Sequence, residues 1–341
     1  MLIRMKAGIV GATGYLGAEL LRLLATHPHL EVGPVQADST AGTPLSTLYP
    51  GLWQVYGDRV VGRYDLDALL ACEVVFVALP SGLSQGVIPH LVGKVRLVVD
   101  LGADFRLKDP ALYDQWYGFT HQHPKMLSES TYGLVEINRG ALNGAPLISS
   151  PGCYVTAASL ALAPLVRAGK IEPTGVIVDA ASGTSGAGKD PQPSTHHAQV
   201  NENYVAYAVT THRHTPEIEQ ATGASVLFTP HLLPMTRGIL ATMYVRPIGE
   251  TSTQATLDFF RDVYRDDQFV TITDGLPSTR DTYGSNSVHI GARFDTRSGT
   301  LILFSALDNL TKGGSGQAIQ AANIALGFDE GAGLPKVALL P

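Results

Sequence analysis

The chain has 341 residues, of which 45% are hydrophobic and 16% charged, so it can bury a sizeable core and divide into two domains. Its net charge of −6 and pI near 6.0 provide no broad basic field, which argues against DNA or RNA partners. Its two cysteines, Cys72 and Cys153, cannot form a disulfide framework and indicate free thiols in a reducing compartment such as the cytoplasm.

The sequence predicts neither a signal peptide nor a membrane span. The start, MLIRMKAGIV, lacks the long apolar region and small-residue cleavage site of a signal peptide. The longest uncharged run, residues 140–166, is interrupted by Asn, Gly, Pro and Ser residues. It is therefore expected to form a strand, a turn and a helix rather than a transmembrane helix.

The first part of the chain has the pattern of a doubly wound α/β domain. Residues 7–110 alternate short apolar runs with helix-like segments, and runs such as VVFVA suit strands buried on both faces of a parallel sheet. We expect a Rossmann-type dinucleotide-binding domain over residues 1–150. A C-terminal helix, at about 314–341, is expected to complete it.

A glycine motif follows the first predicted strand. The segment GIVGATGYLGAELLRLL has a GxxGxxG pattern at the start of a helix. Glycine there lets the backbone turn tightly and approach a pyrophosphate, whose charge the helix N-terminus stabilises. A βα turn without a ligand is the alternative. The residues predicted to contact the cofactor here are Gly11, Thr13, Gly14, Tyr15, Leu16 and Gly17.

The end of the second strand, QADSTAG, bears on the choice between NAD and NADP. Asp38 would accept a hydrogen bond from the ribose 2′-OH and repel a 2′-phosphate, whereas Ser39 and Thr40 would donate to a phosphate. These residues alone favour NAD.

Short-chain dehydrogenases share the glycine pattern but need Tyr followed by Lys four residues later, and none of the 13 tyrosines meets that requirement.

Cys153 lies in SSPGCYVTAASLALAPL, between a Pro-Gly turn and a predicted helix. The N–H groups and dipole of a helix N-terminus stabilise a thiolate, and the same N–H groups can hold an oxyanion. We interpret Cys153 as a nucleophile; a small buried residue is the alternative. Cys72, which precedes the VVFVA strand, is expected to be structural.

The segment THRHTPEIEQA offers a base for this thiol. His212 and His214 precede a predicted helix in which Thr215 is the expected N-cap, Pro216 the first residue and Glu217 an acid able to orient a histidine. A zinc site is not expected, because the chain has no CxxC or HExxH spacing.

Residues 151–313 predict an α+β catalytic and oligomerisation domain on a largely antiparallel sheet. Its strands include GVIVDAASG, ILATMYVRP and TLILFSALD, with helices near HTPEIEQA and STQATLDFFRDVYR.

The loop SGTSGAGKD contains GxxxxGK, but Asp-Pro follows where a P-loop needs Ser or Thr and a helix. A Gly-rich substrate loop is the better interpretation.

The motifs together resemble the N-acetyl-γ-glutamyl-phosphate reductases. GATGYLGAELLRLL, ALPSGLSQ, VVDLGADFRLKDPALYDQWYG, YGLVEINR, SPGCYVTA, SGTSGAGK, THRHTPEI, FTPHLLPMTRGIL and DNLTKGGSGQAIQAANIALG occur in that family's order, between about residues 7 and 328. The resemblance implies reduction of N-acetyl-γ-glutamyl phosphate by NADPH, giving N-acetylglutamate 5-semialdehyde and phosphate in arginine biosynthesis. It also implies a homo-oligomer, usually a tetramer, with a dimer as the alternative.

The resemblance also assigns roles to residues. Cys153 displaces phosphate to form a thioester, which hydride converts to the aldehyde, and His214, or else His212, is the acid/base. The implied cofactor contacts beyond the glycine turn are Ser39, Thr40, Ser81, Ser185, Gly186 and Asn309. The implied substrate contacts are Arg106, Ser182, Gly183, Tyr207 and Arg237. The two arginines suit a carboxylate or phosphate, and structural ion pairs are their alternative role.

Two departures from the family pattern leave alternatives open. Ser81 stands where the family often has His, and Asp38 where many members have Arg or a small residue, so the NADP preference is open. Rival functions are reduction of carrier-bound aminoadipyl phosphate in lysine biosynthesis and an activity like that of aspartate-semialdehyde dehydrogenase. A nucleotide-binding sensor without catalysis is the alternative from a different class, against which Cys153 and His214 argue.

Overall fold

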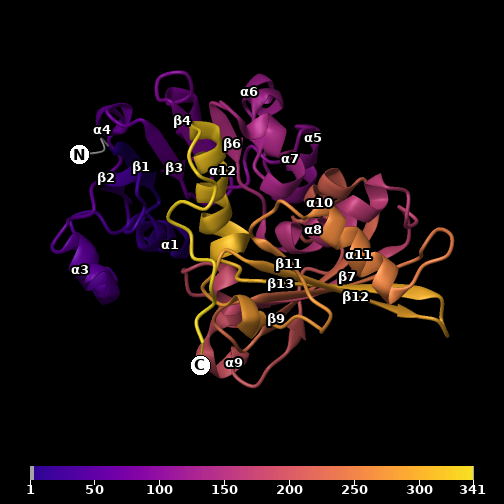
Figure 1. The fold of residues 1–341 in the computed structure, drawn as a ribbon. Coiled ribbons are helices and arrows are strands. Elements are labelled where there is room, and N and C mark those ends of the chain that lie inside the picture. Colours follow the sequence, from indigo (N-terminus) through magenta and orange to yellow (C-terminus); the bar gives the residue numbers. More distant parts are fainter. Residues whose placement is uncertain (1–3, 341) are drawn as a thin grey trace. The chain divides into compact units, whose positions relative to one another are not determined.

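The computed structural model describes residues 4–340 (Figure 1). Residues 1–3 and 341, which the predicted domain boundaries include, lie outside the described part. The chain divides into two units, one of Met1–Pro151 with Gly314–Leu334 and one of Gly152–Gly313 with Pro335–Pro341. Within residues 4–340, no helix is both long and apolar enough to cross a membrane.

The first unit is built on a six-stranded sheet in the order β2-β1-β3-β4-β6-β5. The strands are β1 (Met5–Val10), β2 (Leu30–Gln36), β3 (Val74–Val77), β4 (Leu97–Asp100), β5 (Thr131–Tyr132) and β6 (Leu147–Ser149). All neighbouring pairs are parallel. β3 and β4 are buried along their whole length, and all their residues except Asp100 at the end of β4 are apolar, as expected for central strands covered on both faces. The predicted doubly wound parallel sheet is confirmed.

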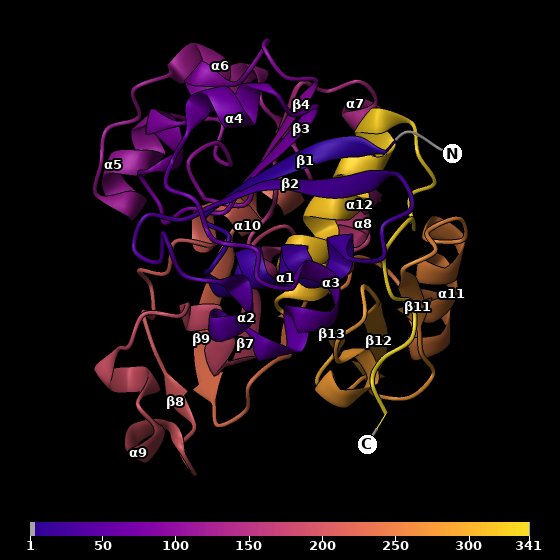
Figure 2. The same cartoon turned by 90° about the vertical axis from the view of Figure 1, so that its left-hand side faces the viewer.

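Helices cover both faces of this sheet. Figure 2 shows β1 and β2 between α4 on one side and α1 and α12 on the other. The main helices are α1 (Tyr15–Leu24), α4 (Leu66–Leu70), α5 (Ala111–Tyr117), α6 (Pro124–Glu129), α7 (Val135–Leu142) and α12 (Gly316–Leu326), with short turns α2 (Leu45–Leu48) and α3 (Trp53–Tyr56). Helix α12 is shorter than the predicted segment 314–341, because Gly327 ends it in the left-handed conformation.

The turn from β1 into α1 depends on glycine at two of its three motif positions. Gly11 has a φ of 77°, and a Cβ there would lie 2.2 Å from the carbonyl oxygen of Ala78. A Cβ on Gly17 would lie 2.4 Å from the carbonyl oxygen of Gly11. Gly14, the N-cap of α1, would meet only that same oxygen, at 3.6 Å. The space beside Gly14 is therefore open at the helix N-terminus.

The second unit contains a seven-stranded sheet in the order β11-β12-β13-β10-β7-β9-β8. The strands are β7 (Val176–Gly183), β8 (Val205–Ala206), β9 (Val226–Leu233), β10 (Ile239–Val245), β11 (Val270–Ile272), β12 (Val288–Asp295) and β13 (Thr300–Leu307). The pairs β7–β9 and β11–β12 are parallel and the others antiparallel. This agrees with the predicted, largely antiparallel sheet.

The long helices of the second unit lie on one side of its sheet, as Figure 1 shows. They are α8 (Cys153–Arg167), α10 (Thr215–Thr222) and α11 (Thr253–Val263); a short helix, α9 (His197–Val200), lies in an exposed segment. The predicted N-cap of α10, Thr215, is wrong by one residue. His214 occupies that position with a helical backbone, and the buried Thr215 Oγ1 has no hydrogen-bond partner within residues 4–340.

We expect Gly17→Ala to destabilise the protein by about 1–3 kcal/mol, because its methyl group would overlap the backbone of Gly11 and Ala12. Gly14→Ala is the matched control and should change the free energy of unfolding much less, since its added methyl group has room. Urea unfolding of both variants measures the difference. Equal stability of the two variants would contradict the packing argument.

Candidate active site

Cys153 is the first residue of α8, after Gly152 in an extended backbone conformation. The helix is buried from Tyr154 to Ala163, whereas the Cys153 side chain is partly exposed. Burial of the helix body fixes its N-terminus, and the sulfur lies at the end where N–H groups are not used within the helix. The Cys153 side chain is therefore partly accessible to solvent and held at a fixed position.

Cys72 has the opposite environment. It is buried, its Sγ donates to the carbonyl oxygen of Ala68 at 3.4 Å, and burial raises the pKa of its thiol to about 11. Such a thiol stays protonated at neutral pH and is a poor nucleophile. This environment suits the structural role expected for Cys72.

The His214 ring lies directly against the backbone that precedes Cys153. A Cβ built on Gly152 would lie 2.4 Å from His214 Nε2 and 2.7 Å from its Cε1. Only glycine at position 152 leaves room for the imidazole. The structure therefore places His214, rather than His212, beside the residue before the cysteine.

His212 contacts His214 both through a ring nitrogen and through the packing of the two rings. Its Nδ1 accepts the backbone N–H of His214 at 3.1 Å, and the two rings are 4.7 Å apart in an edge-to-face arrangement. Burial, with a smaller effect of the Arg213 charge, lowers the pKa of His212 to about 4. At neutral pH His212 is uncharged and its Nδ1 is occupied by the backbone, so it orients the HRH segment.

Glu217 holds the turn before Cys153. It is fully buried, and its Oε1 accepts the backbone N–H of Gly152 at 3.0 Å. Glu217, which was predicted from the sequence to orient a histidine, thus accepts a hydrogen bond from the turn that leads to the cysteine. Because His214 and Glu217 are three residues apart, they lie on the same side at the start of α10.

A pair of phenols lies beside the histidines. The Tyr207 hydroxyl donates to that of Tyr154 at 3.2 Å, and Tyr154 donates to the carbonyl oxygen of His231 at 3.0 Å. Burial raises the pKa of Tyr207 to about 12 and that of Tyr154 further. Both hydroxyls therefore remain protonated. Tyr207 was expected to bind substrate, whereas Tyr154 was not singled out from the sequence.

The Gly-rich loop after β7 meets the start of the segment after β13. Asn309 Nδ2 donates to Ser185 Oγ at 2.9 Å, and its Oδ1 accepts the N–H of Gly238 at 2.8 Å. A Cβ on Gly186 would lie 3.0 Å from Ser182 Oγ. The structure therefore brings together four residues predicted separately as cofactor or substrate contacts. These are Ser182, Ser185, Gly186 and Asn309.

The neighbouring Gly183 packs against the segment that carries Arg237. A Cβ on Gly183 would lie 2.7 Å from the carbonyl oxygen of Thr236 and 2.8 Å from the Arg237 nitrogen. The Arg237 guanidinium pairs with the fully buried Asp308 at 3.3 Å. The ion pair is the structural role considered as the alternative for this arginine, and the guanidinium remains partly exposed.

Asp308 also organises the segment that leads to the cysteine. Its carboxylate accepts the backbone N–H groups of Gly284 at 2.8 Å and Thr311 at 3.0 Å. At the end of this segment, a Cβ on Gly313 would lie 2.8 Å from the Cβ of Cys153. The Asn309 cluster and Cys153 thus lie at two ends of one short stretch of backbone.

In the first unit, the predicted Ser81 loop follows β3 and is held by Asp104. This buried carboxylate accepts the N–H groups of Gly82 at 2.6 Å and Gln85 at 3.3 Å. Around the glycine turn, Thr13 and Thr40 share a hydrogen bond between their hydroxyls of 2.8 Å. The loops expected to bind the cofactor are therefore fixed by hydrogen bonds within the first unit.

Arg106 is also in the first unit, whereas the other four predicted substrate contacts are in the second. It is buried, and its Nη2 donates to the carbonyl oxygen of Leu101 at 3.0 Å. Its cation acts electrostatically on Asp100 and Asp104. These contacts are of the kind considered as the alternative, structural role of Arg106, and its role as a substrate contact stays a prediction.

Sequence reasoning missed two acids that position candidate residues, Asp104 and Asp308. Their signal is an acidic residue within an otherwise apolar or Gly-rich stretch, as in LGADF and ALDNL. Buried acids of this kind need nearby hydrogen-bond donors, which here are backbone N–H groups. Within residues 4–340, no cluster of three or more His, Cys, Asp or Glu side chains could hold a metal ion.

We expect Glu217→Ala to destabilise the protein by about 1–3 kcal/mol, because it leaves the buried Gly152 N–H without its acceptor. Glu217→Gln keeps a carbonyl oxygen there and should be milder. Glu129→Ala, which removes an exposed carboxylate from helix α6, is the control for loss of a helix carboxylate. Thermal unfolding with iodoacetamide labelling of Cys153 measures both stability and presentation of the thiol. Unchanged stability and labelling in Glu217→Ala would contradict the role of this bond.

Residues 6–145 match the model "Semialdehyde dehydrogenase, NAD binding domain" and residues 153–309 the model "Semialdehyde dehydrogenase, dimerisation domain". The protein is 45% identical to the N-acetyl-γ-glutamyl-phosphate reductase of Symbiobacterium thermophilum, over 97% of each chain. It is 44% identical to the reductase of that name from Geobacillus stearothermophilus, over 99% of this chain and all of the other.

A solved structure shares the fold at much lower sequence identity. Aspartate semialdehyde dehydrogenase II of Vibrio cholerae aligns with a TM-score of 0.71 and 18% identity, over 95% of this chain and 98% of that one. The fold likeness extends over both units, and the sequence identity with the reductases identifies the family. The chain belongs to the N-acetyl-γ-glutamyl-phosphate reductase family.

Proposed function

We propose that the protein reduces N-acetyl-γ-glutamyl phosphate to N-acetylglutamate 5-semialdehyde, with NADPH as the reductant and release of phosphate, as a step of arginine biosynthesis. The observation that carries the chemistry is the partly exposed Cys153 at the start of α8, with the His214 ring packed on the preceding glycine. A free thiol of this kind fits the cytoplasm, where cysteines are kept reduced.

The first step is acyl transfer to sulfur. His214 takes the proton of the Cys153 thiol, and the thiolate attacks the acyl carbon of the acyl phosphate. A carbon–sulfur bond forms, and the bond between that carbon and the phosphate oxygen breaks, so phosphate leaves with the electron pair. The N–H groups at the start of α8 can stabilise the oxyanion that develops on the carbonyl.

The second step is reduction of the thioester, for which a bound nicotinamide supplies the hydride. Protonated His214 stabilises the negative charge that develops on the oxygen, and collapse breaks the carbon–sulfur bond and regenerates the Cys153 thiolate. The glycine turn of the first unit fits the cofactor's pyrophosphate, because the space at Gly14 is open where α1 begins. The cluster of Ser182, Ser185 and Asn309 is the proposed lining of the site in the second unit.

We expect Cys153→Ser to lower kcat by about a thousandfold or more and His214→Ala by about a hundredfold or more, since one loses the nucleophile and the other its base. The test is the reverse reaction, with N-acetylglutamate semialdehyde, phosphate and NADP⁺, followed by the absorbance of reduced cofactor. Cys72→Ala is the control and should keep the wild-type rate.

Full activity of Cys153→Ser would contradict the thioester route. Absence of wild-type activity with this semialdehyde, together with activity on aminoadipate semialdehyde or aspartate semialdehyde, would reassign the substrate.

We propose further that two copies of the chain pair through the open face of the second unit's sheet. The helices cover one face, and the other carries a row of apolar side chains in register across β9, β7 and β10. Leu227, Ile177 and Tyr244 are 53%, 40% and 39% exposed, and Ile302 of β13 continues the row. Such a surface suits a self-complementary contact, and the matching family model is described as a dimerisation domain.

We expect Leu227→Glu to shift the protein to a smaller species in sedimentation velocity, because it places a charge in the centre of this row. Val263→Glu, on α11, is the matched control: it also replaces an exposed apolar side chain but lies on the helix-covered side. A wild-type monomer, or the same change in mass for both variants, would contradict the proposed interface.

A further inference from the structure

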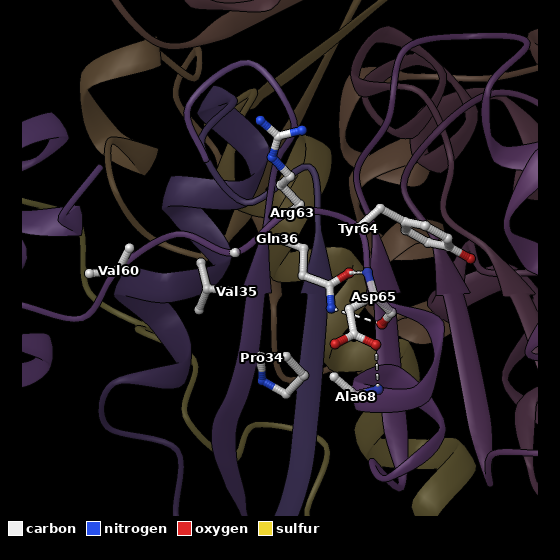
Figure 3. A pocket seen from close by; sticks show the side chains of 9 residues that line it. Pro34, Val35, Gln36, Val60, Arg63, Tyr64, Asp65 and Ala68 are labelled. Carbon is white, nitrogen blue, oxygen red and sulfur yellow. Dashed lines mark hydrogen bonds between the residues drawn. The ribbon is translucent and has the colours of Figure 1, made fainter. Parts of the chain in front are cut away.

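Arg63 lies at the carboxyl end of β2, the strand end expected to face the adenosine ribose. Residues 60–62 run beside β2 in the same direction. The Gly62 N–H donates to the carbonyl oxygen of Val35 at 2.8 Å, and the Ala37 N–H donates to the carbonyl oxygen of Gly62 at 3.0 Å. The chain therefore leaves this pairing next to the last residues of the strand. Figure 3 shows Arg63 extending beyond Gln36, away from Pro34 and Ala68.

The direction of this side chain matters because parallel α/β sheets bind ligands at the carboxyl ends of their strands. Strand β2 runs from Pro34 toward Gln36, so Arg63 extends toward the ligand end. The other arginine of this segment, Arg59, donates to the carbonyl oxygens of Val32 at 2.9 Å and Gly33 at 3.2 Å, earlier along the strand. The two exposed arginines thus lie at different positions along β2: Arg59 beside its middle and Arg63 beside its carboxyl end.

Asp38, the residue that favoured NAD from the sequence alone, is engaged by the same segment. Its Oδ1 accepts the backbone N–H of Tyr64 at 3.3 Å. This carboxylate oxygen is therefore directed toward residue 64. Arg63 is the residue before Tyr64 and adds a positive charge to this segment, which opposes the repulsion that a carboxylate alone would exert on a phosphate.

The hydroxyl residues after β2, Ser39 and Thr40, lie close to the glycine turn before α1. Thr40 Oγ1 is 2.8 Å from Thr13 Oγ1, which connects the loop after β2 to the turn before α1. Ser39, between Asp38 and Thr40, is exposed. A dinucleotide whose pyrophosphate rests on the turn would therefore direct its adenosine ribose toward Ser39 and Arg63.

We propose that Arg63 is the cationic ligand of the adenosine 2′-phosphate of NADPH, with Ser39 as a neutral donor, and that it makes the protein prefer NADPH despite Asp38. The guanidinium provides paired N–H donors that match phosphate oxygens. The inference deepens the proposed function, since it names the residue that selects the form of the cofactor used there.

The test is binding of NADP⁺, NAD⁺ and 2′,5′-ADP by isothermal titration calorimetry, which needs no acyl phosphate. We expect Arg63→Ala to weaken NADP⁺ and 2′,5′-ADP by about 10- to 100-fold, the range for a hydrogen bond to a charged group. NAD⁺ affinity should change by less than about twofold, because NAD⁺ has no 2′-phosphate. Arg63→Lys should recover part of the loss. Arg59→Ala is the matched control and should leave all three affinities unchanged.

Equal weakening of NADP⁺ and NAD⁺ in Arg63→Ala, or an unchanged affinity for 2′,5′-ADP, would overturn the assignment of Arg63 and leave the proposed reductase activity intact. A wild-type preference for NAD⁺ would overturn it in the same way. Failure of the wild-type protein to bind either dinucleotide would instead overturn the proposed function together with this inference.

Discussion

The hydrogen bond from Gly152 to the buried carboxylate of Glu217 fixes the geometry on which the candidate active site depends. It joins the turn before Cys153 to α10, the helix that begins next to His214. Cys153 and His214 are 61 positions apart in the chain, yet one bond at 3.0 Å sets the turn of one relative to the helix of the other. The absence of a side chain at Gly152 is equally necessary, because the imidazole occupies the space where a Cβ would lie.

A buried carboxylate also accepts the backbone N–H of a glycine at two other places in the chain. Asp104 accepts the N–H of Gly82 in the loop after β3, and Asp308 accepts that of Gly284 beside the Arg237 ion pair. In each case a fully buried carboxylate is stabilised by backbone donors, and the glycine allows the chain to turn toward it. Both glycines have positive φ, 91° for Gly82 and 72° for Gly284. Charge-assisted bonds of this kind offset the cost of burying the acid and hold loops at fixed positions.

What the sequence could predict follows from the range of the interactions involved. The glycine turn and the position of Cys153 at a helix N-terminus are local features, so the spacing of Gly11, Gly14 and Gly17 and the Pro-Gly-Cys order were sufficient. The position of the His214 ring against Gly152, on which its proposed role as the base rests, is a contact between distant segments and could not be predicted from the sequence. The hydrogen bonds of Glu217 to Gly152 and of Asp308 to Gly284 and Thr311 involve backbone N–H groups, which carry no sequence signature, so these contacts were not predicted.

The buried cluster of Asp100, Asp104 and Arg106 shows how the arginine predicted to bind substrate also affects the charge balance of the first unit. Burial, and then repulsion from Asp104, raises the pKa of Asp100 to about 7, while Arg106 acts in the opposite direction. An acid with a raised pKa binds its proton more tightly in the folded chain than in the unfolded one, so its contribution to stability falls as pH rises from about 4 to 7. The Arg106 cation limits that loss and favours the charged form of Asp104, which holds the loop after β3. Replacement of Arg106 by a neutral residue would therefore leave two buried acids without their nearby cation.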